Sequence, residues 1–207
     1  TAGKAQVSDA TNASRTMLCD IRSLSWSDDI LAAFNIPADI LPTIVSCTEN
    51  VGTIADGLPG SGLAITGLIG DQQSAAVGQG CITPGSVKST YGTGCFVLQN
   101  TGDELIYSQS RLLSTVAYQS GGRVSYAVEG SIFNAGTVVQ WCRDEMGLIE
   151  TAEDSEDMVS GLNDTGGVYM VPAFTGLGAP YWDADARGII TGITRNTSRA
   201  QMVRAAL

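Results

Sequence analysis

Four short β-like runs follow one another between residues 87 and 130, and turn-forming residues separate them. The runs are VKSTYG (87–92), CFVLQN (95–100), LLSTVAYQ (112–119) and VSYAVEG (124–130). The segment SGG (120–122) between the last two runs predicts a tight hairpin. Because helical patterns flank these runs, the sequence predicts a mixed α/β fold.

The helical patterns differ in how clearly the sequence marks their ends. Residues 27–34 (SDDILAAF) combine a capping serine, two acids in the first turn and an apolar stripe. Further helices are predicted over residues 72–80, 131–148, 153–162 and 198–207. Buried strands are predicted over residues 63–70 and 168–174.

Composition excludes several classes of protein. The net charge of −10 disfavours nucleic acid as a partner, because an acidic surface repels phosphate backbones. No apolar stretch approaches the roughly 20 residues of a membrane helix, so we expect no membrane partner. The five cysteines are odd in number and contain no C-x-x-C pair, which favours reduced thiols and a cytoplasmic location. The chain has no histidine, so any acid–base chemistry must fall to carboxylates, lysines or tyrosines.

The chain is expected to be part of a longer protein. It begins without methionine, and the helix pattern at its end reaches Leu207 with no stop signal. A change of pattern near CITPG (81–85) predicts a domain boundary, with residues 1–80 ending one domain and residues 81–207 beginning another.

One carboxylate stands at the end of an apolar run, in the segment ITGLIGDQQSAAVG (65–78). Asp71 is either an ordinary turn residue that bonds nearby backbone N–H groups or a general base. The second interpretation rests on its position, because ligands bind at the carboxyl ends of strands in open α/β sheets. Gln72 and Gln73 are neutral, so either side chain could bond a polyol without raising the pKa of the carboxylate.

Two further segments are rich in glycine. In STYGTGC (89–95), Gly92 and Gly94 flank Thr93, which is typical of a hairpin turn or of a phosphate-binding loop with a hydroxyl donor. In NAGTVVQW (134–141), Gly136 lies in a helical pattern, where glycine costs about 1 kcal/mol against alanine. A close packing contact or a ligand must offset that cost, and Gln140 lies one turn further on the same face.

The loop PAFTGLGAPYW (172–182) contains two glycines, two prolines and three aromatic residues. It is either a structured corner whose rings cover the core or one wall of an active-site cleft. Neither interpretation is preferred by the segment alone.

Together, several motifs resemble those of carbohydrate kinases built on the actin-like, ribonuclease-H-like ATPase fold, and in particular the members that phosphorylate glycerol. The motifs are TNASRTM (11–17), GDQQ (70–73), TYGTGCF (90–96), QWCRDEMGL (140–148) and VPAFTGLGAPYWDADARG (171–188). The resemblance implies an internal fragment that holds the end of the first kinase domain and the start of the second. It also implies ATP and Mg²⁺ as cofactors, glycerol and ATP as partners, and a parent protein that self-associates.

Residue roles follow from the same resemblance. Asp71 matches the catalytic base, with a possible second role toward a water molecule bound to Mg²⁺. Gln72 and Phe96 match residues that contact glycerol. The nucleotide-binding positions that match are Gly92, Thr93, Gly94, Gly136 and Gln140.

The motifs leave alternatives open. A related kinase for xylulose or gluconate and a hydrolase of the same superfold share much of this pattern, and the isolated fragment could be a non-catalytic module. Family members controlled by fructose 1,6-bisphosphate carry Gly-x-Arg shortly before GDQQ. This chain has Gly60-Ser61-Gly62 there, so no arginine is present to pair a phosphate, and we expect that control to be absent.

Overall fold

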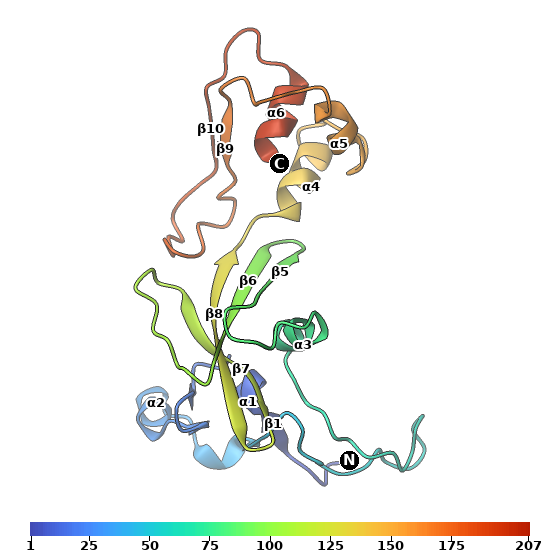
Figure 1. The fold of residues 1–207 in the computed structure, drawn as a ribbon, viewed down its shortest axis with the longest axis vertical. Coiled ribbons are helices and arrows are strands. Elements are labelled where there is room, and N and C mark those ends of the chain that lie inside the picture. The colour runs from blue at the N-terminus through green and yellow to red at the C-terminus, as the bar shows by residue number, and fades with distance from the viewer. The chain divides into compact units, whose positions relative to one another are not determined.

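The computed structural model describes residues 1–207, and the chain divides into two compact units. Unit 1 comprises Thr1–Lys88 and Leu98–Glu129, and unit 2 comprises Ser89–Val97 and Gly130–Leu207. Figure 1 shows helices and strands mixed along the chain, which confirms the predicted α/β class. No helix is long and apolar enough to cross a bilayer, and all five cysteines are free thiols.

Unit 1 begins with a parallel strand pair and five short elements between its two strands. In chain order these are β1 (Val7–Asp9), α1 (Ala10–Ala13), β2 (Cys19–Asp20), β3 (Ser25–Trp26), α2 (Asp28–Phe34), a 3₁₀ turn (Ala38–Ile40) and β4 (Thr43–Val45). The helix predicted over 27–34 is confirmed. The Ser27 side chain caps α2 by accepting from the Ile30 N–H at 3.4 Å, and two acidic residues occupy the first turn.

A four-stranded sheet follows, in the order β5 (Val87–Tyr91), β6 (Cys95–Gly102), β8 (Arg123–Ile132), β7 (Leu113–Ser120). The predicted hairpin is confirmed, because β7 and β8 pair antiparallel across a turn in which Gly121 and Gly122 have φ of 57° and 76°. Helix α3 (Asp71–Gly78) packs on the part of this sheet that belongs to unit 1. The buried core there consists of Ala76, Cys81, Leu98, Ala117 and Ala127.

Unit 2 gathers three helices beside a two-stranded ribbon. The elements are α4 (Gly136–Asp144), α5 (Asp154–Val159), β9 (Tyr169–Val171), β10 (Ile189–Thr191) and α6 (Arg199–Ala206). The strands pair antiparallel, and Cys142, Ile149, Val159 and Val203 form the core between the helices. A capping box between Ser198 and Gln201 begins α6, so the predicted helix at the end of the chain is confirmed.

Three predicted elements differ from the structure. The strand over 63–70 is wrong: only Ala64 forms an isolated bridge, with Thr53, and Leu63 is 63% exposed. An apolar run shows where burial would be favourable, but it does not supply the neighbouring strand that pairing requires. The helix over 131–148 begins only at Gly136, because β8 continues through Ile132. The strand over 168–174 shortens to β9, and it is not buried, since Tyr169 is 66% exposed.

Candidate active site

Asp71 is the first residue of α3, and its side chain is exposed. Its Oδ1 accepts the N–H of Gln72 at 2.7 Å. The residue before it, Gly70, is the N-cap and has extended backbone angles (φ −63°, ψ 152°). Asp71 therefore follows an extended segment and not the buried strand that the sequence predicted. The positive end of the helix dipole favours a carboxylate at this position.

A buried hydrogen-bond relay fixes the backbone immediately before Asp71. The N–H of Gly70 donates to the hydroxyl of Thr11 at 2.8 Å, and that hydroxyl donates to Oδ2 of Asp9. The backbone N–H of Thr11 donates to the same oxygen at 2.8 Å. Thr11 and Asp9 are 0% and 1% exposed, so these bonds are shielded from water and their donor directions are fixed.

Gly70 is closely surrounded by polar side chains. A Cβ atom at this position would lie 2.7 Å from Oε1 of Gln73. A side chain at this position would require the amide of the buried Gln73 to move, and its Cβ would lie 3.4 Å from the hydroxyl oxygen of Thr11.

The two glutamines after Asp71 have different surroundings. Gln73 is 2% exposed and lies inside unit 1. Gln72 is half-buried, and its Oε1 accepts from Nζ of Lys88 at 2.7 Å. Gln72, the residue predicted to contact a polyol, is therefore the glutamine that stays beside Asp71 at the surface of unit 1.

Replacing Thr11 tests the relay. Thr11→Val keeps the shape of the side chain but removes the hydroxyl, which leaves the Gly70 N–H without its acceptor and removes one donor from Asp9. We expect a loss of about 1–3 kcal/mol in stability, the usual cost of unsatisfied buried groups. The measurement is the thermal unfolding midpoint of the complete protein that contains these residues. Thr11→Ser keeps the hydroxyl and is the matched control; equal midpoints for the two variants would contradict the relay.

The second predicted segment forms the connection between neighbouring strands β5 and β6 in unit 2. The N–H of Gly92 donates to the carbonyl of Gly94 at 2.9 Å, so the three residues form a tight turn. The Thr93 side chain is exposed. Within unit 2, the N–H groups of Thr93 and Gly94 donate to no protein acceptor. Hydroxyl and N–H donors grouped in this way suit an anion.

The turn is bound tightly to the beginning of α4. The carbonyl of Gly92 accepts the N–H of Gly136 at 2.9 Å. The carbonyl of Thr93 accepts the N–H of Ala135 at 2.9 Å and the hydroxyl of Thr137 at 3.1 Å. The first N–H groups of α4, which have no partner within the helix, are therefore satisfied by the turn.

Three glycines of this arrangement have different reasons to be glycine. A Cβ on Gly136 would lie 2.6 Å from the carbonyl oxygen of Gly92, and a Cβ on Gly94 would lie 2.5 Å from that of Ile132. Gly136 is the first residue of α4 and not an interior one, so the helix-interior cost expected from the sequence does not apply. The close contact offered as one explanation for this glycine is confirmed. A Cβ on Gly92 would meet only the carbonyl oxygen of Gly94, at an ordinary 4.0 Å, so packing does not explain this glycine, whereas close approach of a ligand would.

Two other predicted positions lie near this arrangement in the sequence and in unit 2. Gln140 is exposed on α4, one turn after Gly136. Phe96 is half-buried on β6, two residues after Gly94. The structure thus brings Gly92, Thr93, Gly94 and Gly136 together, and separately Asp71 and Gln72. That both groups face one cleft stays a prediction.

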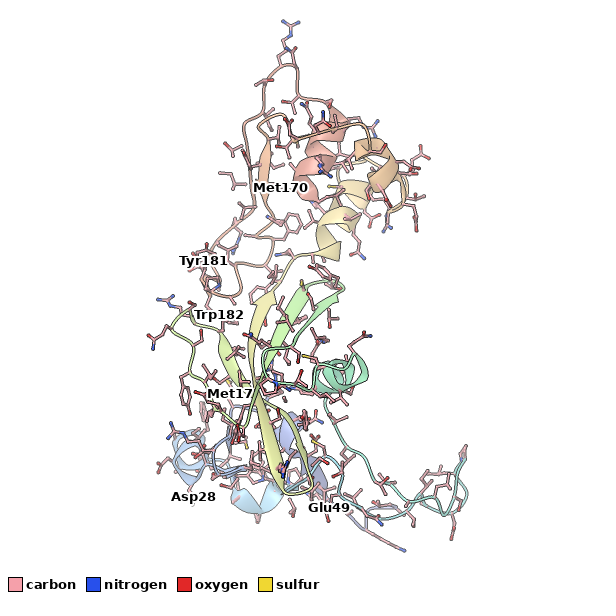
Figure 2. All side chains as sticks on the ribbon, viewed as in Figure 1. Met17, Asp28, Glu49, Met170, Tyr181 and Trp182 are labelled. Atoms are coloured by element: carbon pink, nitrogen blue, oxygen red, sulfur yellow. The ribbon has the colours of Figure 1, made fainter.

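The loop PAFTGLGAPYW connects β9 toward β10 and packs against the end of β8. The N–H of Ala179 donates to the carbonyl of Ser131 at 2.9 Å, and the rings of Phe133 and Trp182 meet edge to face at 6.2 Å. Figure 2 shows Tyr181 and Trp182 on this loop. These contacts fit the interpretation of a structured corner, and a role as a cleft wall stays a prediction.

The residues fit a nucleotide better than a protein-held metal ion. The open face at Gly92 and the exposed Thr93 hydroxyl are suited to phosphate oxygens. No group of three or more His, Cys, Asp or Glu side chains is arranged to hold a metal. Mg²⁺ usually keeps several waters and binds through one or two carboxylates and the substrate phosphates, so Asp71 alone could serve such an ion.

Sequence reasoning missed the residues that support the site from behind. These are Asp9, Thr11, Arg15, Lys88 and Glu129, which are all part of unit 1. The motif TNASRTM was a usable signal, because it contains two of these residues. Thr11 accepts the N–H of Gly70, and Arg15 donates to the buried Glu129. Lys88 and Glu129 gave another, as lone charges within β-like runs.

Comparison with known proteins identifies the family. Residues 2–78 match the N-terminal domain of the FGGY family of carbohydrate kinases, and residues 87–207 match its C-terminal domain. The chain belongs to this family. The gap between the two matches contains the predicted boundary at residue 80, and that boundary itself stays a prediction.

Individual relatives are similar along the entire chain. A glycerol kinase from Coxiella burnetii is 58% identical over 207 residues, which are 100% of this chain and 41% of the relative. A crystal structure of Plasmodium falciparum glycerol kinase with ADP is 42% identical with a TM-score of 0.87, over 97% of this chain and 40% of that one. A gluconate kinase from Lactobacillus acidophilus is 25% identical with a TM-score of 0.82, over 97% and 41%. The chain thus spans about two fifths of the length of the relatives it matches.

Proposed function

We propose that the complete protein transfers the terminal phosphoryl group of ATP to a terminal hydroxyl of glycerol, giving glycerol 3-phosphate. The observation that carries this proposal is the fixed carboxylate of Asp71 beside Gln72. The similarity to glycerol kinases at 58% and 42% identity favours glycerol over xylulose or gluconate, since the gluconate kinase is only 25% identical.

Asp71 acts as the general base in this proposal. Glycerol is a neutral alcohol, and its hydroxyl is a poor nucleophile until a base accepts its proton. An exposed carboxylate at a helix N-terminus can accept that proton, and the Gly70–Thr11–Asp9 relay holds its backbone in place. Gln72 and Phe96 would contact the polyol, through the amide and the ring face respectively.

The turn at Thr93 serves the phosphates. Its hydroxyl and the N–H groups of Thr93 and Gly94 supply donors, and Gly92 leaves room for close approach. Gly136 keeps the turn against α4, and Gln140 lies one turn away for a ribose or base. Mg²⁺, when bound with the nucleotide, supplies charge neutralisation at the transferred group. Asp71 is the chain's candidate contact to a water molecule of that ion.

The test is ADP release by the complete protein with ATP and Mg²⁺, in parallel reactions with glycerol, xylulose, gluconate and no polyol. We expect glycerol-dependent release. Release only with another sugar would keep the base and change the substrate. Equal release in every reaction would make the protein a hydrolase of ATP, and no release would leave a non-catalytic module. A cytoplasmic location and self-association are further parts of the proposal, and size-exclusion chromatography of the complete protein tests the second.

A further inference from the structure

We infer that Lys88 is a positioning residue that sets the orientation of the Gln72 amide and thereby the affinity for the polyol. This inference rests on the proposed function, in which Gln72 contacts the substrate. It concerns a residue behind the site, which no step of the proposed reaction uses directly.

Lys88 contacts Gln72 in two places. Its Nζ donates to Oε1 of Gln72 at 2.7 Å and to the main-chain carbonyl of the same residue at 3.3 Å. The two contacts hold both the side chain and the backbone of Gln72, so the amide has little freedom to rotate.

The lysine also settles which end of the amide faces inward. An ammonium group donates hydrogen bonds and accepts none, so only the amide oxygen can face it. Covalent geometry then turns the nitrogen of Gln72 away from Lys88. Toward a hydroxyl group, Gln72 therefore acts through its N–H₂ as a donor to the hydroxyl oxygen.

Lys88 is an unusual residue for its location. It is 6% exposed on β5, whereas buried lysines are rare unless they are paired. It is also one of only two lysines in the chain; the other, Lys4, is exposed. A buried ammonium group without hydrogen bonds would destabilise the fold, because burial removes its hydration.

Nearby carboxylates act against the effect of burial on Lys88. Burial lowers the pKa of Lys88, and the negative charges of Glu129 and Asp71 oppose that shift. Glu129 is 1% exposed and is itself paired with Arg15 at 2.9 Å. Arg15, Glu129 and Lys88 thus alternate in charge, and Lys88 in turn contacts the neutral side chain of Gln72.

A double-mutant cycle with Lys88→Met and Gln72→Ala in the complete protein tests the inference. Losing a hydrogen bond to a charged group typically costs a factor of about 10–100 in an equilibrium constant. We expect Lys88→Met to raise the KM for glycerol by about that factor, with kcat and the KM for ATP changed less than about threefold. In the Gln72→Ala background, Lys88→Met should not raise the KM for glycerol further, because the side chain that Lys88 positions has been removed. Lys4→Met is the matched control and should leave all constants unchanged.

The outcomes distinguish a failure of the positioning role of Lys88 from a failure of the proposed function. The positioning role would be overturned if the two substitutions had multiplicative effects on KM, or if kcat fell equally with every substrate. In either case, glycerol turnover by the wild type would still uphold the proposed function. A wild type without polyol-dependent ADP release would overturn both. If Lys88→Met fails to fold, Lys88→Arg replaces it: that variant keeps the charge facing Glu129 but moves the donor, and the same cycle with Gln72→Ala decides.

Discussion

Asp71→Asn lowers kcat for glycerol in the complete protein by about 10²–10⁴-fold, the usual contribution of a general base. The amide has nearly the shape of the carboxylate, and its oxygen can still accept the Gln72 N–H that Oδ1 accepts at 2.7 Å. It cannot accept the proton of the hydroxyl group. We therefore expect the KM values for glycerol and ATP to change little. Steady-state ADP release across a range of both substrates measures all three constants.

Asp28→Asn is the matched control for this substitution. Asp28 is also an exposed aspartate at the first position of a helix, and Figure 2 shows it on α2. Both substitutions remove one negative charge from a helix N-terminus, so any general effect on helix stability is shared. An Asp71→Asn variant with near-wild-type kcat would remove Asp71 from the role of base.

Local sequence patterns predicted those parts of the fold that depend on nearby residues. The hairpin of β7 and β8 follows from paired glycines that adopt positive φ, and α2 follows from its cap and acidic first turn. The strand predicted over 63–70 was wrong, because its apolar residues favour burial without specifying a neighbouring strand. The predicted beginning of α4 was wrong, because strand β8 before it continues further than its apolar pattern indicated.

The site was predictable at its surface and not behind it. Motifs located Asp71, Gln72 and the Thr93 turn, because such residues are spaced closely along the chain. The support of Asp71 comes from Thr11, which is 59 positions away from Gly70, and no local pattern links them. In strand β5, apolar side chains face outward and a charged side chain faces inward, which reverses the usual alternation.

That reversal explains why Lys88 escaped notice. Hydrophobicity would place Val87 and Tyr91 inside and the lysine between them outside. In the structure Val87 is 57% exposed and Tyr91 is 81% exposed, whereas Lys88 is 6% exposed. Lys88 points inward from this edge strand and its Nζ donates to Oε1 of Gln72 at 2.7 Å, and the sequence of β5 alone does not contain that partner.

Gly136→Ala should raise the KM for ATP by about 5–100-fold and lower the stability of unit 2 by about 1–3 kcal/mol, as overpacking usually does. The new methyl group would lie 2.6 Å from the carbonyl oxygen of Gly92, so the turn and the first residues of α4 must separate. The bonds of the Gly136 and Ala135 N–H groups to the turn would lengthen, and the donors around Thr93 would lose their arrangement. Steady-state kinetics and the unfolding midpoint of the complete protein measure both effects.

The sign of the stability change makes this substitution informative. Replacing a glycine with alanine normally stabilises a protein where the backbone conformation and the space suit alanine, because alanine loses less conformational entropy on folding. Gly161→Ala is the control: this glycine of unit 2 has open space around it and no positive φ, so we expect no loss of stability and an unchanged KM for ATP. A destabilised Gly136→Ala with a normal KM for ATP would show that the contact only packs α4 against the turn. A stable variant with a raised KM would place the methyl group in the path of the nucleotide itself.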